Sequence, residues 1–373
     1  MLIVPVVSKD GKPLMPTKPA KARKMIEGGV AKKCWSKTGV FYIQMLIPVG
    51  EEVQDMFASL TDDFVLRALA IDPGSKYDGY AVSGGKDVAL KAMAVMPQKV
   101  NKKVTERRQL RRSRRYRNKR RGKCRFNNRK RREGWIAPSQ LVKVQFRIKI
   151  VRDLAKIFPL NFIAVEDVRF NHYKKRWGKH FSTVEIGKTI LYEELERHGH
   201  VTKFAGWQTA EARKYWGIKK SSAKDALIPE SHANDALAML NEVFGDNVDN
   251  SCTFMVWRRL EFARRSLHRQ NYKKGGIRPR FGGTTNGHHL RKGDIAYGQI
   301  GNRQLVGWVC GLPTDKTEAV AIADATGKRL AQCSERKIRL LRRATGVTWE
   351  SQYIPKPLPV TPILQEPVQL ELF

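Results

Sequence analysis

The sequence predicts an α/β fold, and three observations lead to this class. Residues 66–96 contain a buried-strand pattern that ends in an acid and is followed by two further strand patterns, which predicts a β-meander. Residues 139–244 then alternate between helical and strand spacing of apolar residues. Past Cys252 the chain changes to short strand patterns, which predict a small, separate β-barrel-like domain.

The first 55 residues predict a small unit of their own. Val4–Val7 and Val40–Ile47 have the composition of strands, whereas Lys12–Thr17 carries two prolines and predicts a turn. Between them, the segment from Pro19 to Gly28 predicts a short helix with basic positions. Residues 51–63 are an acidic connector to the next unit.

The central region supplies the elements of the main α/β unit. A helix is expected over residues 139–158, where apolar residues recur at helical spacing and Ser139 is placed as the N-cap. The elements expected in this region, in order, are strands at 66–72, 79–83 and 88–96, the helix at 139–158, a strand at 161–165, a helix at 184–197, a strand at 201–204 and a helix at 231–244.

The charge of the chain indicates a polyanionic partner. The 71 Lys and Arg residues against 35 Asp and Glu give a net charge of +36, which is the composition of a nucleic-acid-binding protein. The basic residues are concentrated between Lys102 and Arg132, where 18 Lys or Arg accompany a single acid, Glu106. Solvated helices ordinarily interleave both signs, so this segment predicts contacts to phosphates.

Other classes are disfavoured by the same composition. No apolar run is long enough for a membrane span, and the N-terminus lacks the pattern of a signal peptide. The five cysteines are scattered without a CxxC pair, which disfavours a structural zinc site and fits a reducing compartment. We therefore expect a cytoplasmic protein without a membrane partner.

Three acids stand where apolar elements end. They are Asp72 after the first strand, Glu166 after a later strand, and Asp235 in a helix that follows. A buried acid needs compensation, and carboxylate oxygens suit Mg²⁺. His232 precedes Asp235 by three residues, so both side chains can share one helix face, and a neutral histidine can accept a proton from water. This order of acids on strand, strand and helix is the layout of ribonuclease H-like nucleases.

At the level of whole motifs, the sequence resembles the IscB group of transposon-encoded RNA-guided nucleases, and most closely its shorter members, called IsrB. The motifs that carry the resemblance are Lys12-Pro-Leu-Met-Pro16, Ile71-Asp-Pro-Gly-Ser75, Arg107 to Arg132, Val165-Glu-Asp-Val168 and His232-Ala-Asn-Asp-Ala-Leu237.

The resemblance implies a domain order and a set of site residues. It implies a PLMP domain (1–55), RuvC segments at 64–100, 135–200 and 201–250, an arginine-rich bridge helix at 101–134, a domain at 251–345 that contacts guide RNA and reads a flanking motif, and a Pro-rich tail at 346–373. It implies catalysis by Asp72, Glu166, His232 and Asp235, with two Mg²⁺ ions (or Mn²⁺) held by Asp72, Glu166 and Asp235. The nucleic-acid contacts are expected from Arg107, Arg108, Arg111, Arg112, Arg114, Arg115, Arg117, Arg120, Arg121 and Arg125.

The resemblance also implies a prokaryotic cell, partners and a product. The partners are a guide (omega) RNA and a double-stranded DNA target with a short flanking motif, bound by a monomeric protein. IscB proteins carry an HNH nuclease domain between the second and third RuvC segments, but only 65 residues separate Glu166 from His232 here. One nuclease centre then implies a nick in the displaced non-target strand. A junction-type nuclease that needs no RNA and a non-catalytic RNA-binding scaffold remain open as alternatives.

Overall fold

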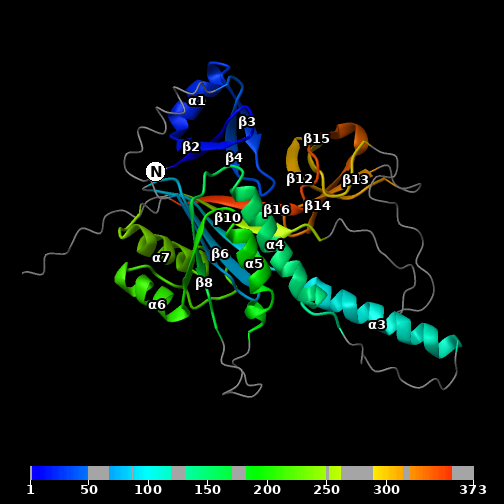
Figure 1. Cartoon of the computed structure of the whole chain (residues 1–373). Helices are drawn as coiled ribbons and strands as arrows, with labels where there is room; N and C mark the ends of the chain where they lie inside the picture. Colours follow the sequence, from blue (N-terminus) through cyan, green and yellow to red (C-terminus); the bar gives the residue numbers. More distant parts are fainter. Residues whose placement is uncertain are drawn as a thin grey trace, which may run out of the picture.

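The computed structural model of the chain describes residues 2–48, 67–85, 87–118, 131–169, 182–248, 252–261, 289–313 and 319–354, with the side chains of 114–118 left out. The described strands form three sheets (Figure 1), and the largest of them is the centre of the molecule. No helix in these ranges is both long and apolar enough to cross a membrane.

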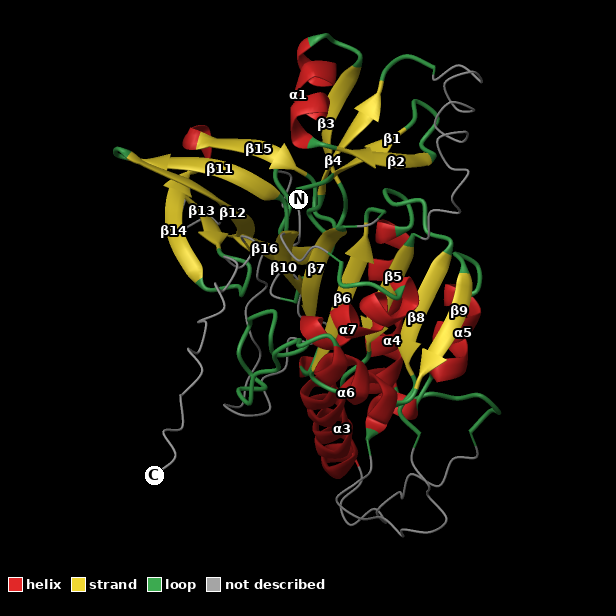
Figure 2. Cartoon of the chain, turned by 90° about the vertical axis from the view of Figure 1, so that its left-hand side faces the viewer, coloured by secondary structure: helices red, strands yellow, loops and turns green. Residues whose placement is uncertain are grey.

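The central sheet has seven strands in the order β16-β10-β7-β6-β5-β8-β9, which Figure 2 shows side by side. The meander β5-β6-β7 is antiparallel, and β8 and β9 continue the sheet parallel to β5. This order confirms the predicted α/β core of ribonuclease H-like type. The strands are β5 (Ala68–Asp72), β6 (Tyr77–Ser83), β7 (Val88–Val95), β8 (Phe162–Glu166), β9 (His200–Phe204), β10 (Cys252–Arg259) and β16 (Val347–Ile354).

Helices cover both faces of the central sheet. One face carries α4 and α5, and the other carries α7 with α6 packed against it (Figure 1). The bounds are α4 (Pro138–Leu154), η1 (Thr183–Glu185), α5 (Lys188–Leu195), α6 (Gly206–Tyr215) and α7 (Ala233–Phe244). The predicted N-cap at Ser139 is wrong, because α4 begins at Pro138, a residue whose fixed φ and missing N–H suit a first helical position.

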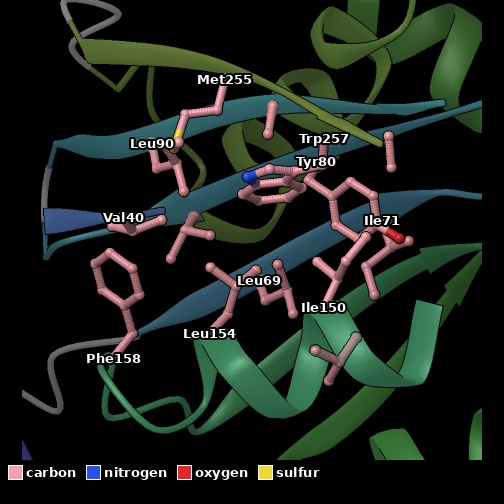
Figure 3. Close-up of a cluster of buried hydrophobic side chains, with 14 of the residues drawn as sticks. Val40, Leu69, Ile71, Tyr80, Leu90, Ile150, Leu154, Phe158, Met255 and Trp257 are labelled. Carbon is pink, nitrogen blue, oxygen red and sulfur yellow. The ribbon is translucent and has the colours of Figure 1, made fainter. Parts of the chain in front are cut away.

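The main core lies between the sheet and α4. Leu69 and Ile71 of β5 pack with Ile150 and Leu154 of α4 and with Trp257 of β10 (Figure 3). On the opposite face the sheet presents alanines, and Ala236, Met239 and Leu240 of α7 pack against them. This side of the sheet therefore holds α7 near the strand ends that carry the predicted acids.

The N-terminal sheet has the order β2-β1-β4-β3. Its strands are β1 (Val4–Val7), β2 (Pro13–Thr17), β3 (Ala31–Trp35) and β4 (Phe41–Met45), and α1 (Pro19–Glu27) packs beside them. The turn predicted at Lys12–Thr17 is wrong, because Pro13–Thr17 is an edge strand. An edge position tolerates proline, since one side of the strand makes no ladder hydrogen bonds.

The C-terminal sheet is antiparallel, with the order β14-β13-β12-β11-β15. Its elements are β11 (Ile295–Ile300), β12 (Arg303–Gly311), β13 (Ala319–Ala323), β14 (Arg329–Ser334), η2 (Glu335–Lys337) and β15 (Ile338–Arg342). Within the described residues the outer strands β14 and β15 do not pair, so strand pairing does not close this sheet into a ring.

The segments on either side of the C-terminal sheet belong to the central sheet, which differs from the boundaries predicted at residues 251 and 346. β10 and β16 pair antiparallel along their whole length, from Cys252 opposite Ile354 to Arg259 opposite Val347. β10 also pairs parallel with β7. The C-terminal sheet is therefore an insertion between two strands of the core. The rest of the predicted Pro-rich tail, 355–373, lies outside the described residues.

Candidate active site

The register of β5 and β8 places Asp72 beside Glu166. Ile71 is the partner of Val165 in the parallel ladder, so each acid follows a paired residue at the same edge of the sheet. Side chains alternate along a strand, and the alanines two and four residues before Asp72 face α7. Both acids therefore project on the face that α7 covers.

Asp72 is only 8% exposed, and its surroundings disfavour the charged form. Burial, followed by a hydrogen bond and the negative charge of Glu166 and by the charge of Asp235, raises the pKa of Asp72 well above its usual value. Two carboxylates this close repel each other unless a proton or a cation lies between them. Gly206, the first residue of α6, leaves space beside Glu166, since a Cβ at this position would lie 3.0 Å from Glu166 Oε1.

Asp235 lies in the first turn of α7 and is 4% exposed. Arg213 Nε approaches its Oδ1 to 2.7 Å, and Lys220 Nζ approaches its Oδ2 to 2.6 Å. The Arg213 contact has the distance of an ion pair without the alignment of a hydrogen bond, so Oδ1 has no hydrogen-bond partner. The two cations neutralise a carboxylate that is otherwise buried among acids.

His232 caps α7 and so stands just before the helix. Its Nε2 lies 3.0 Å from the carbonyl oxygen of Lys224, which makes Nε2 the protonated nitrogen and leaves Nδ1 as the basic one. Its ring packs on Tyr77 with 5.3 Å between ring centroids. The role of His232 as a proton acceptor stays a prediction.

The donor set fits a hard divalent cation. The three carboxylates supply oxygen ligands, and Asp235 Oδ1 is a buried oxygen that lacks a hydrogen bond. In the part of the chain that the structure describes, no three His, Cys, Asp or Glu side chains converge closely enough to enclose an ion as they stand. Both carboxylate oxygens of Asp235 face cations in this structure, Oδ1 towards Arg213 and Oδ2 towards Lys220.

Asp167, the neighbour of Glu166, projects to the other face of the sheet and anchors α5. It accepts hydrogen bonds from Lys188 Nζ at 2.5 Å, Tyr192 Oη at 2.8 Å and Arg169 Nε at 2.8 Å. Burial alone would raise the pKa of Asp167, but these hydrogen bonds lower it to about 2. This role was not predicted from the sequence. The signal for it is the pair of consecutive acids at 166 and 167, because consecutive residues at the end of a strand point to opposite faces of the sheet.

The turn after Asp72 is held by a buried ion pair that sequence reasoning also missed. Arg147 of α4, 3% exposed, binds Asp78 with both Nε and an Nη, at 2.7 and 2.9 Å, and donates to the Gly74 carbonyl at 2.6 Å. Lys143, one helical turn earlier, donates to the Ser75 carbonyl at 2.6 Å. The signal in the sequence is a pair of cations at i and i+4 on the apolar face of a helix.

The predicted arginine-rich segment begins as the single helix α3 (Lys99–Asn118), which Figure 1 shows projecting away from the sheets. Arg107, Arg108, Arg111 and Arg112 are exposed on it, whereas Leu110 is buried. Arg114, Arg115 and Arg117 also lie in α3, but their side chains are outside the described part. Arg120, Arg121 and Arg125 fall wholly outside it.

Known families and structures were compared with the chain. Residues 4–186 match the family model of the RRXRR protein. The matched range runs from β1 through α3 to η1, and Arg111-Arg-Ser-Arg-Arg115 has the spacing of that description. No curated protein sequence is significantly similar to the chain.

Solved structures similar to parts of the chain include Holliday junction enzymes. RuvC of T. thermophilus in complex with a Holliday junction substrate shares 15% identity, covers 48% of this chain and 96% of its own, and gives a TM-score of 0.27. The yeast mitochondrial Holliday junction resolvase Ydc2 shares 12% identity, with 47% of this chain and 76% of its own chain covered, and gives a TM-score of 0.25. These scores are low, so the fold assignment rests on the strand order of the chain itself.

Proposed function

We propose that the chain is an RNA-guided DNA endonuclease that nicks the displaced non-target strand. The observation that carries the proposal is the position of Asp72, Glu166 and Asp235 at one edge and on one face of a ribonuclease H-like sheet. Phosphodiester hydrolysis at such a site needs oxygen ligands for cations and a proton acceptor for water.

Each residue has a proposed part in the reaction. Asp72, Glu166 and Asp235 would hold two Mg²⁺ ions, which when bound activate water and stabilise charge on the phosphate oxygens. His232, whose Nε2 is engaged by the Lys224 carbonyl, would take the proton of the attacking water on Nδ1. Arg213 and Lys220 pair with the Asp235 carboxylate and would hold it in place before cations arrive.

Guidance by RNA is supported by α3 and by the resemblance to the IscB group. The match to the RRXRR family model includes the N-terminal sheet, the strand of Asp72, α3 and the strand of Glu166 in one continuous range. α3 follows the meander directly and precedes α4 in the chain, so a strand bound to its arginines would be anchored to the core that carries the acids. One centre of acids supports a cut in one strand.

Guide dependence is the property that separates this proposal from its rivals. The protein should be purified with its RNA, the RNA sequenced, and cleavage measured on a matching duplex and on a four-way DNA junction, each with and without that RNA. Cleavage of the matching duplex only with RNA supports the proposal. Junction cleavage without RNA would show a structure-selective nuclease, and RNA binding without any metal-dependent cleavage would show a scaffold.

A further inference from the structure

A second site lies between α4, the end of β10 and the C-terminal sheet. A cavity of about 460 Å³ opens there, which is within the size range of small-ligand pockets. It is formed by residues of four segments that are far apart in sequence: α4, the end of β10 with Arg259, the stretch before β11 with Lys292, and the stretch before β16 with Gly346. The proposed cleavage reaction does not use this cavity.

The α4 wall of the cavity has two chemically different stripes. Val142 and Phe146 are one turn apart and make an apolar stripe of which only a small part is exposed, 8% of Val142 and 3% of Phe146. Gln145 and Lys149 make a polar stripe beside it. An apolar surface next to hydrogen-bonding groups suits a planar ring with polar edges. Gly346 lines the far side with a φ of +77°, and a Cβ there would lie 2.9 Å from Lys149 Nζ.

The basic side chains that line the cavity favour an anionic ligand. Lys149, Arg259 and Lys292 line it, and none of the described lining residues is acidic. The nearby acids are already engaged: Asp153 accepts from Thr38, Glu261 pairs with Lys99, and Asp294 pairs with Arg343. Burial, and then the positive charges of Lys37 and Arg259, lower the pKa of Lys149, although the negative charge of Asp153 opposes this shift. A bound phosphate would relieve this repulsion between cations.

The position of the cavity relates it to the nucleic acid. β10 runs in the same direction as β5 and β8, so Arg259 lies at the same edge of the sheet as Asp72, but on the opposite face, which α4 covers. Three strand spacings separate β10 from β5, which is about 14 Å. Lys99 at the start of α3 pairs with Glu261 at 3.4 Å, so the arginine-rich helix begins at the rim of the cavity.

We infer that this cavity binds one nucleotide of the strand that runs along α3, with its base against Val142 and Phe146 and its phosphate between Lys149, Arg259 and Lys292. The inference rests on the proposed binding of nucleic acid by α3 and is independent of cleavage. The ligand chemistry, a phosphate joined to an aromatic base, is shared by RNA and DNA, so the source is decided by experiment.

Binding to the full-length protein is measured by calorimetry without divalent cations, which keeps the result separate from the success or failure of cleavage. The probes are adenosine monophosphate, inorganic phosphate, and single-stranded RNA and DNA oligonucleotides. The variants are Lys292→Ala, which removes a cation from the wall, Lys292→Arg, which retains it, and Val142→Phe, which fills the apolar stripe without a change in charge. Lys156→Ala, an exposed position near the other end of α4, is the control for overall charge.

The expected result is that Lys292→Ala and Val142→Phe each weaken binding of the mononucleotide by roughly tenfold or more, whereas Lys292→Arg and Lys156→Ala leave it within about twofold. Inorganic phosphate should bind at least about tenfold more weakly than the mononucleotide, since it lacks a base. The oligonucleotide, RNA or DNA, whose binding is weakened by Val142→Phe identifies the strand that supplies the nucleotide. Equal binding of phosphate and mononucleotide, native affinity in both cavity variants, or no effect of Val142→Phe on either oligonucleotide would overturn the inference.

Discussion

Asp72 is held in a setting that favours its neutral form. Its pKa is raised by burial and by Glu166 and Asp235, so the folded state binds a proton there more tightly than the unfolded chain does. The stability linked to this group is present at low pH and is lost as pH rises above about 3.8 towards the folded-state pKa. The native carboxylate is thus costly at neutral pH, which is common for groups kept for catalysis.

The substitution Asp72→Asn should therefore raise the unfolding temperature at pH 7 in the absence of divalent cations, while it abolishes cleavage. Below about pH 4 the variant and the native protein should be equally stable, since both side chains are then neutral. Thermal unfolding at the two pH values tests this. A variant that is less stable than the native protein at pH 7 would show that the charged form is not disfavoured.

Asp167 has the opposite pH dependence. Hydrogen bonds from Lys188, Arg169 and Tyr192 lower its pKa to about 2 from the usual 3.8. Its contribution is fully present above about pH 4 and is lost as pH falls through 2, and it amounts to about 2 kcal/mol. Asp167→Asn should remove this amount at pH 7, measured by urea unfolding, and the difference should narrow below pH 4. If the stability of the variant and of the native protein fell equally as the pH is lowered below 4, the lowered pKa of Asp167 would be contradicted.

At the scale of elements, the Arg147–Asp78 pair links α4 to the turn that follows Asp72. Removing one partner leaves a buried charge without its counterion, so Arg147→Met alone should cost about 3–5 kcal/mol. Replacing both partners with apolar residues should recover much of this loss. Chemical unfolding of the two single variants and the double variant measures the coupling. Additive effects would show that the two residues do not act as a pair.

The helix α3 is the element with the largest excess of positive charge. If it and the residues that follow neutralise ten phosphates, the logarithm of the binding constant should fall with the logarithm of salt concentration with a slope of roughly −9 for duplex DNA and about −7 for a single strand. Replacing the four exposed arginines 107, 108, 111 and 112 with Gln should lessen the slope by about three or four. A slope that stays unchanged would place the contacts elsewhere.

The sequence was informative for elements with strong patterns and weak for those that depend on partners. The strands of Asp72 and Glu166 were predicted because continuous apolar runs ended in acids. β3 was missed because Lys32 and Lys33 interrupt its pattern, and β16 because an edge strand is half exposed and stands next to a proline-rich segment. Contacts such as Arg147 with Asp78 could not be predicted, since they join residues 69 positions apart.

At the scale of the molecule, the arginine-rich helix α3 and the C-terminal sheet are both insertions into the chain that forms the central domain. α3 lies between β7 and α4, and the C-terminal sheet lies between β10 and β16. Met255, Trp257 and Val347 belong to the main core, so a truncation at residue 251 would remove core strands together with the C-terminal sheet. Both α3 and the C-terminal sheet are thus joined directly to the sheet that carries the acids, an arrangement that fits the proposed guidance of cleavage by bound RNA.

The central claim is that one centre, built from Asp72, Glu166 and Asp235, cuts one strand under the direction of RNA. The most direct test is a supercoiled plasmid that carries the guide-matched sequence and flanking motif, incubated with protein, guide RNA and Mg²⁺. Nicked circles should accumulate, and Asp72→Ala or Glu166→Ala should abolish them while RNA and DNA binding persist. Linear plasmid as the first product, or nicking that survives Asp72→Ala, would contradict the account.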